Sequence, residues 1–349
     1  MRSRAGARLI DWGSASSNAR LVGGPGPKTT TSERDGLAED LAQSVARAEV
    51  LVTELTQLAT GTQPARAWVM SRGSWVDANL RSLERIMGPL MERLLAEHPS
   101  RKSWRSKALC TQVGGLLGYV SRKVIGQYDV FLPPDDEGII YFVGPNVIAT
   151  ERKASFVPRD FRLWVSVHEV THRAQFTSAP WLRGYLSGML DAYLSTIDVD
   201  PKQLLTNVQR ALADATGKGD LKGISMMLSV MTPEQRRIFD RMQAMMALLE
   251  GHASFVMNAV AASEIPTLAQ LQRGLQDRRT GMGAMERTFQ KTIGFDQKIK
   301  QYSIGEHFVR EVVEAAGMDA FNQIWRGPET LPSPEEIAEP SRWLGRVRP

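Results

Sequence analysis

The stretch WVSVHEVTHRAQF, residues 164–176, places two histidines four residues apart, with a glutamate directly after the first. Its apolar residues, among them Trp164, Val165 and Val170, predict an α-helix. Each residue of an α-helix advances about 100°, so His168 and His172 project from one face, about 6 Å apart along the axis. Two imidazoles at this separation can bind a single metal ion.

Glu169 lies beside this pair, at the edge of the same helix face. From there its carboxylate can reach a water molecule on the metal without being a ligand itself. The pattern is H-E-x-x-H, and with only five histidines in 349 residues a chance match is expected in under about one per cent of such chains. Zinc takes neutral histidine nitrogens and keeps one position for water in catalytic sites. We therefore predict a zinc site with Glu169 as general base.

Composition narrows the classes of protein and of metal ligand. Cys110 is the single cysteine, so an intrachain disulfide and a thiolate-rich site are excluded, and histidines and carboxylates must hold the metal. The 43 basic and 38 acidic residues leave a net charge of +5, which is weak evidence for nucleic-acid binding. No uncharged apolar run of membrane-spanning length is present. We expect a cytoplasmic protein without membrane contact.

The first half of the chain is predicted to mix helices with a small sheet. Residues 1–35 are rich in Gly, Ser, Pro and Thr and are expected to form an irregular arm. Apolar spacing from Leu37 predicts a helix that ends near Gly61. Further helices are predicted over residues 75–98 and 109–125. Short β-branched and aromatic runs, broken by Pro and Gly over residues 128–151, predict a small sheet that residues 67–70 join.

After Pro158 the pattern is almost entirely helical. The predicted helices cover residues 160–177, 181–197, 201–216, 233–262, 267–277 and 297–316, with a short one near Phe321. The expected fold class is therefore mainly α with a small β-sheet placed before the H-E-x-x-H helix. We expect one metallohydrolase domain over residues 36–349, with helices and sheet in 36–158 and the helical zinc-binding part in 159–349.

A catalytic zinc site needs a third protein ligand. The extended H-E-x-x-H-x-x-G-x-x-H form is excluded, because Gln175 and Ser178 stand where it requires Gly and His. Asp191, with 18 residues between it and His172, is one carboxylate candidate. Glu250 is the other, and it is our choice, because it lies in the apolar segment MMALLEGHASFVMNAV, where a charge needs a compensating partner.

His252 stands two residues beyond Glu250, about 200° further round a helix, so the two cannot both point at one metal. It is either the true third ligand, a group that supports a ligand or binds the oxyanion, or a structural histidine. The remaining histidines, His98 and His307, are expected to lie outside the site.

The segments HEVTHRAQF and LLEGHA together resemble the zincin-like metallopeptidases, and LEGHA is similar to the segment that supplies the glutamate ligand in gluzincin aminopeptidases. More closely, the chain resembles zincin-like metallopeptidase type 2, a bacterial family of proposed hydrolases, some of them associated by name with deazaflavin-coenzyme biosynthesis. The resemblance also rests on IDWGSA, GGLLGYVSRKVIGQYDVFLP, GIIYFVGPN, PWLRGYL and KIKQYSIGEHFV. It implies a zincin-like fold and a hydrolase. Thermolysin-like enzymes orient a ligand histidine with an Asp four residues after the ligand glutamate. Ser254 stands there, which leaves Ser254, Asn258 or another segment for this role.

These residues predict a mechanism. Zinc held by His168, His172 and Glu250 lowers the pKa of its water toward about 7, and Glu169 takes the proton as that water attacks a peptide-type carbonyl. The substrate is expected to be a peptide or a protein. An oxyanion donor is usual in such sites, and His252, Tyr302 and Tyr185 are the candidates.

Two other classes of function compete with this one. A zincin fold with a structural metal, or with a non-proteolytic role in a biosynthetic complex, keeps the same residues. A nucleic-acid or partner-binding helical protein is favoured by RKSWRSK at residues 101–107, but these charges are spaced like those of a solvated helix face. The stretch GIIYFVGPNVI is either a sheet edge that accepts an extended peptide or an ordinary core strand.

Overall fold

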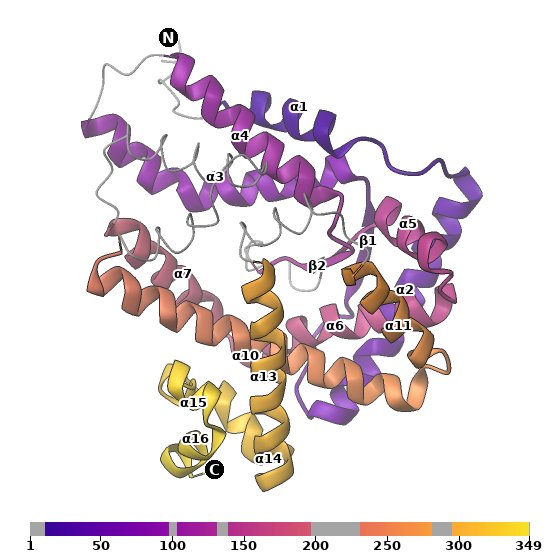
Figure 1. Cartoon of the computed structure of the whole chain (residues 1–349), viewed down its shortest axis with the longest axis vertical. Helices are drawn as coiled ribbons and strands as arrows, with labels where there is room; N and C mark the ends of the chain where they lie inside the picture. Colours follow the sequence, from indigo (N-terminus) through magenta and orange to yellow (C-terminus); the bar gives the residue numbers. More distant parts are fainter. Residues whose placement is uncertain (1–10, 98–102, 131–138, 197–230, 281–294, 349) are drawn as a thin grey trace.

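The computed structural model describes residues 11–97, 103–130, 139–196, 231–280 and 295–348 (Figure 1). Within these ranges the protein is mainly helical with one small sheet, as predicted. The elements are α1 (Trp12–Gly23), α2 (Thr31–Thr56), β1 (Arg66–Met70), α3 (Arg72–Glu97), α4 (Ser103–Ser121), β2 (Gly126–Tyr128), β3 (Ile139–Val143), α5 (Gly144–Ala154), α6 (Pro158–Ser178), α7 (Trp181–Ser195), α10 (Pro233–Glu264), α11 (Leu268–Thr280), α13 (Phe295–Ala316), α14 (Met318–Phe321), the 3-10 helices η1 (Asn322–Trp325) and η2 (Pro328–Thr330), α15 (Pro334–Ala338) and α16 (Pro340–Val347).

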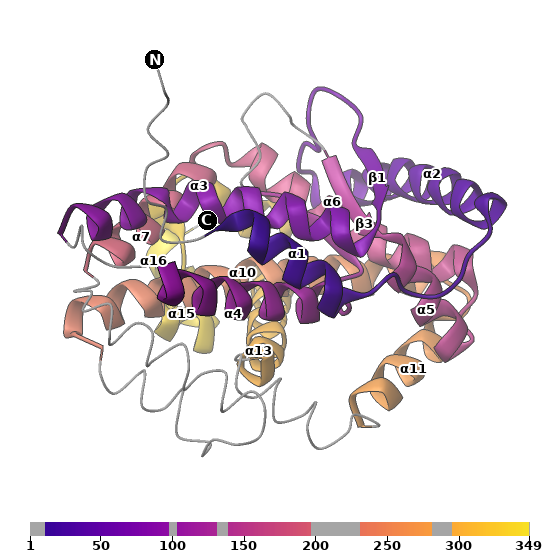
Figure 2. The ribbon, with the colours of Figure 1, turned by 90° about the horizontal axis from the view of Figure 1, so that it is seen from above.

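The N-terminal segment differs from the irregular arm expected over residues 1–35. The Asp11 side chain accepts hydrogen bonds from the backbone N–H groups of Gly13 and Ser14, so it caps α1. A capping box formed by Thr30 and Glu33 starts α2. The small polar residues that suggested loops therefore act as helix caps. Figure 2 shows α1 running beside α4, against which it packs.

The three-stranded sheet has the order β1-β3-β2. Strand β3 pairs in parallel with β1 and antiparallel with β2, so it is the central strand. The stretch GIIYFVGPNVI is thus not a sheet edge. Its second half is helix α5, where a strand was expected, because Pro145 stands in the first turn and is suited to a helix start. Strand β2 packs against α6.

Helix α6 carries the H-E-x-x-H segment and packs against both α2 and α10 (Figure 1). The observed bounds lie close to the predicted ones for α6, α7, α10, α11, α13 and α14. The helix predicted over residues 201–216 lies outside the described residues. Helix α10 is long and apolar enough to cross a membrane, but 72% of its most apolar window is buried inside the fold, which is typical of a core helix.

Helix α10 crosses α13 at a point where the two backbones touch. A Cβ atom on Gly251 would lie 2.1 Å from the carbonyl carbon of Gly305, so neither glycine leaves room for a side chain. Beyond the crossing, Glu306 accepts hydrogen bonds from Ser254 at 2.7 Å and from Asn258 at 3.2 Å. The turn of α10 that carries Glu250 is therefore fixed against α13.

Candidate metal centre

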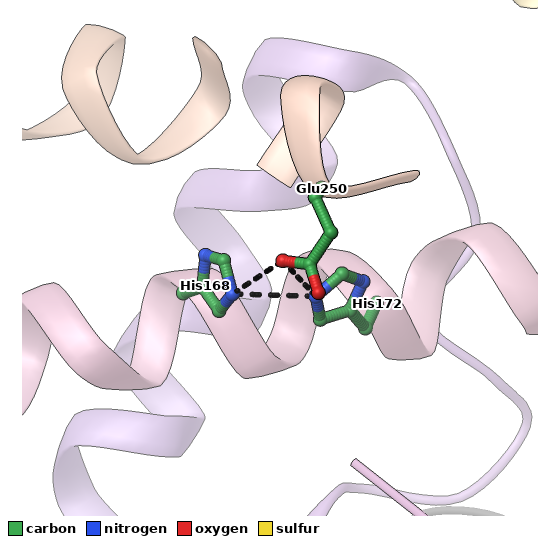
Figure 3. A group of neighbouring side chains, drawn as sticks. All are labelled: His168, His172 and Glu250. Atoms are coloured by element: carbon green, nitrogen blue, oxygen red, sulfur yellow. Dashed lines mark hydrogen bonds and ion pairs between the residues drawn. The ribbon is translucent and has the colours of Figure 1, made fainter. Parts of the chain in front are cut away.

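Three side-chain atoms from two helices converge at one point (Figure 3). The Nε2 atoms of His168 and His172 lie 3.3 Å apart. The Oε2 atom of Glu250 lies 3.5 Å from the first and 3.6 Å from the second. Ligands at about 2.0–2.1 Å in a tetrahedral zinc site are about 3.3–3.4 Å from one another. The two nitrogens and one oxygen therefore fit a zinc ion in chemical type and in spacing.

The helices explain this convergence. His168 and His172 are one turn apart on α6, with ring centroids 4.8 Å from each other and ring planes nearly perpendicular. Glu250 reaches them from the facing turn of α10, where it is 7% exposed. The histidine side chains keep 19% and 15% of their surface exposed. The cluster is thus buried on the glutamate side and partly open on the histidine side.

The electrostatics of the cluster favour a cation. Burial acts to lower the pKa of His172. The hydrogen bond and the negative charge of Glu250, the charge of Glu169 and the hydrogen bond of Gln175 together outweigh burial, so the pKa is raised. A buried carboxylate that stabilises a proton on His172 also stabilises a metal ion in its place. Protons and metal therefore compete for this position.

The predicted general base, Glu169, is also buried, and β2 holds it from the other side. Its Oε2 atom accepts a hydrogen bond from the backbone N–H of Tyr128 at 2.8 Å. A Cβ atom on Gly126 would lie only 2.7 Å from Glu169 Oε1, so the strand approaches the carboxylate as closely as glycine permits. One carboxylate oxygen is thus fixed by the backbone beside the metal-binding pair.

The structure gives the other predicted site residues different places. His252 is completely buried, its ring lies 5.0 Å from Phe321 and 5.5 Å from Trp325 between centroids, and burial, with His172 nearby, lowers its pKa to about 3. His252 is not one of the three converging donors, and its Nδ1 atom lies 3.0 Å from the amide nitrogen of Gln175 instead. Asp191 is exposed on α7 and is not part of the cluster.

The two tyrosines proposed as oxyanion donors remain predictions. Tyr185 is half-buried on α7, with its ring 5.9 Å from that of Trp181. Tyr302 belongs to α13, but its side chain lies outside the described residues. Of the histidines outside the site, His307 is exposed and lies 3.8 Å from Glu311, and His98 lies outside the described residues.

Two contacts of the site were not predicted. The amide of Gln175 lies 3.0 Å from His172 Nδ1, and the backbone of Tyr128 binds Glu169. Gln175 follows His172 by three residues, so it shares a helix face with that histidine, and this spacing could have indicated the contact. Nothing in the sequence indicates the contact to the Tyr128 backbone.

Two histidine nitrogens and a glutamate oxygen that converge in a mainly helical protein form a group that could hold a metal ion. The family model of the zincin-like metallopeptidases matches residues 10–344, so this chain belongs to that family. A crystal structure of a "putative hydrolase with a novel fold" from Chloroflexus aurantiacus is similar, with 31% identity and a TM-score of 0.73, over 97% of this chain and 99% of that one. No curated protein matches the chain. Both similarities support a hydrolase.

Proposed function

We propose that this protein is a zinc-dependent metallopeptidase whose metal is held by His168, His172 and Glu250. The observation that carries the proposal is the convergence of two imidazole nitrogens and one carboxylate oxygen at separations of 3.3 to 3.6 Å. These are the ligand types and spacings of a catalytic zinc site. Family membership supports the same class of reaction.

The number of converging donors favours a catalytic metal over a structural one. Structural zinc sites have four protein ligands, whereas catalytic ones have three and leave the fourth position to water or substrate. Within the described part of the chain, the cluster has three members. The partial exposure of both histidines lets solvent reach that side.

Zinc bound there supplies two effects, a lower pKa for a water molecule and polarisation of the substrate carbonyl. Glu169 accepts the proton of the attacking water and then delivers it to the leaving amine. The Tyr128 N–H group keeps Glu169 Oε2 in place, so the other oxygen, Oε1, carries the proton. An amide carbonyl with an amine leaving group matches these roles, which is why we propose a peptide or protein substrate.

The proposal is tested with the full-length, zinc-loaded protein and an unbiased peptide library. We expect cleavage that EDTA abolishes and zinc restores. Glu169→Gln keeps the zinc but loses about 10²- to 10⁴-fold in rate, the range that general acid–base catalysis contributes. If Glu169→Gln retains full activity, the role of Glu169 is wrong. If the zinc-loaded wild type cleaves nothing, the non-proteolytic alternative stands instead.

A further inference from the structure

We propose that Gln175 is a positioning residue that fixes His172 in the tautomer that binds metal, and that His252 and the Leu249 carbonyl in turn fix Gln175. The inference rests on the metal site proposed above. It gives His252 a positioning role, which is compatible with its complete burial. It also provides a residue that orients a metal-binding histidine, a role that Ser254 does not fill because its hydroxyl donates to Glu306.

The chain of contacts starts from the Gln175 amide, which is completely buried on α6. Its Oε1 atom lies 3.0 Å from His172 Nδ1. Its Nε2 atom lies 2.9 Å from the carbonyl oxygen of Leu249 and 3.0 Å from Nδ1 of His252. All three distances are those of hydrogen bonds.

The Leu249 carbonyl fixes which atom donates and which accepts in each of these hydrogen bonds. A carbonyl oxygen only accepts, so the amide atom facing it must be the NH₂ group, and Oε1 must face His172. Because Oε1 also only accepts, His172 donates from Nδ1. A neutral imidazole has a single N–H, so His172 Nε2 is left with its lone pair directed at Glu250 and His168, as a metal ligand requires.

His252 secures the same orientation at a second point. The other N–H of Gln175 faces Nδ1 of His252, so that nitrogen must be an acceptor. Turning the amide over would set its oxygen against the carbonyl oxygen of Leu249, and neither of these oxygens can donate. The rings of Phe321 and Trp325 hold His252 in place. The amide therefore has one favourable orientation.

The arrangement also couples the two ligand helices. Leu249 and His252 flank Glu250 on α10, whereas Gln175 and His172 lie on α6. A single buried amide thus joins the turn that supplies the carboxylate ligand to the turn that supplies a histidine ligand. The hydrogen bonds of Gln175 therefore fix α6 and α10 relative to each other beside the proposed metal ligands.

The test is zinc affinity of the full-length protein, measured by competition with a chromophoric chelator, for Gln175→Met and for Thr171→Val. Methionine keeps the length of the side chain and removes both donor and acceptor. Thr171 is a matched control, because it is buried on the same helix and its hydroxyl donates a hydrogen bond to the Val167 carbonyl of that helix. We expect zinc affinity to fall about 10- to 100-fold in Gln175→Met, as for other groups that orient a metal-binding histidine, and to stay within about twofold in Thr171→Val.

A second readout follows the tautomer itself. Long-range proton–nitrogen NMR spectra of the zinc-loaded protein should show the His172 Nδ1–H proton in the wild type, because a buried hydrogen bond to Gln175 slows its exchange with water, and should lose this signal to exchange in Gln175→Met. A wild-type His172 that binds zinc through Nδ1 and carries its proton on Nε2 overturns the proposal even if the variant does not fold. Wild-type zinc affinity in Gln175→Met overturns it as well. A wild type that binds no zinc refutes the proposed function, whereas a zinc-binding wild type with the His172 proton on Nε2 refutes only the role of Gln175.

Discussion

The crossing of α10 and α13 provides a sharp test of how the fold holds the third ligand. In Gly251→Ala the new Cβ would lie 2.1 Å from the carbonyl carbon of Gly305, where ordinary contacts are at least 3.4 Å, so the backbones must part by about 1.3 Å. Overpacking of this kind costs about 1–3 kcal/mol or more. Alanine recovers about 1 kcal/mol over glycine in a helix interior. Since only backbone atoms are in the way, we expect a net loss of about 2 kcal/mol in unfolding free energy.

The displacement should also weaken the metal site, because Glu250 precedes Gly251 directly and ligand distances tolerate only about 0.2 Å. Urea unfolding of the metal-free protein and chelator competition for zinc measure the two effects. Gly188→Ala is the matched control, since a Cβ on this glycine of α7 meets nothing within 4 Å. We expect it to leave zinc affinity unchanged and stability equal or higher. If Gly251→Ala behaves like Gly188→Ala in both assays, the crossing does not position Glu250.

Three further predictions follow from buried contacts. In Gly126→Ala the new Cβ would lie 2.7 Å from Glu169 Oε1. Metal analysis should find the zinc retained, but the peptidase rate should fall about 10²-fold or more because the general base is displaced. An unchanged rate contradicts the placement of the base. The pKa of His252 is lowered to about 3, so only the unfolded chain gains its proton as the pH falls below about 6.5. Between pH 7 and pH 5 the metal-free wild type should therefore lose about 2 kcal/mol of stability relative to His252→Asn, measured by urea unfolding. Glu49→Ala removes the ion-pair partner of Arg173, which is 1% exposed, and should cost about 3–5 kcal/mol; a thermal shift near zero is inconsistent with a buried pair.

The sequence was sufficient for the parts of the fold that depend on local pattern. The helix around His168 and His172 follows from apolar residues and spacing, and β1 follows from a short β-branched and aromatic run. The helix over residues 12–23 was missed because its polar and small residues resemble a loop until Asp11 caps it. The segment after Val143 was read as strand, although Pro145 begins a helix there. In both cases a helix-start signal outweighs composition.

The three residues that converge in the candidate metal centre were predictable for a related reason. The histidine pair is a local pattern, and Glu250 was notable as a charge in an apolar helix that needed a partner. Gln175 and the Tyr128 backbone were not predicted, because their roles depend on how α6 meets α10 and β2. The sequence left several roles open for His252, and its burial against Phe321 and Trp325 became evident only from the packing of the C-terminal segment.

The most direct test of the account is the zinc affinity of the wild type beside Glu250→Ala and Asp191→Ala, with metal content measured on the same samples. Glu250 is one of the three converging donors, whereas Asp191 is exposed on α7. We predict one zinc per wild-type chain, a loss of more than about 100-fold in affinity for Glu250→Ala, beyond the effect of an orienting group, and no change for Asp191→Ala. Wild-type affinity in Glu250→Ala, or a comparable loss in Asp191→Ala, contradicts the proposed metal centre.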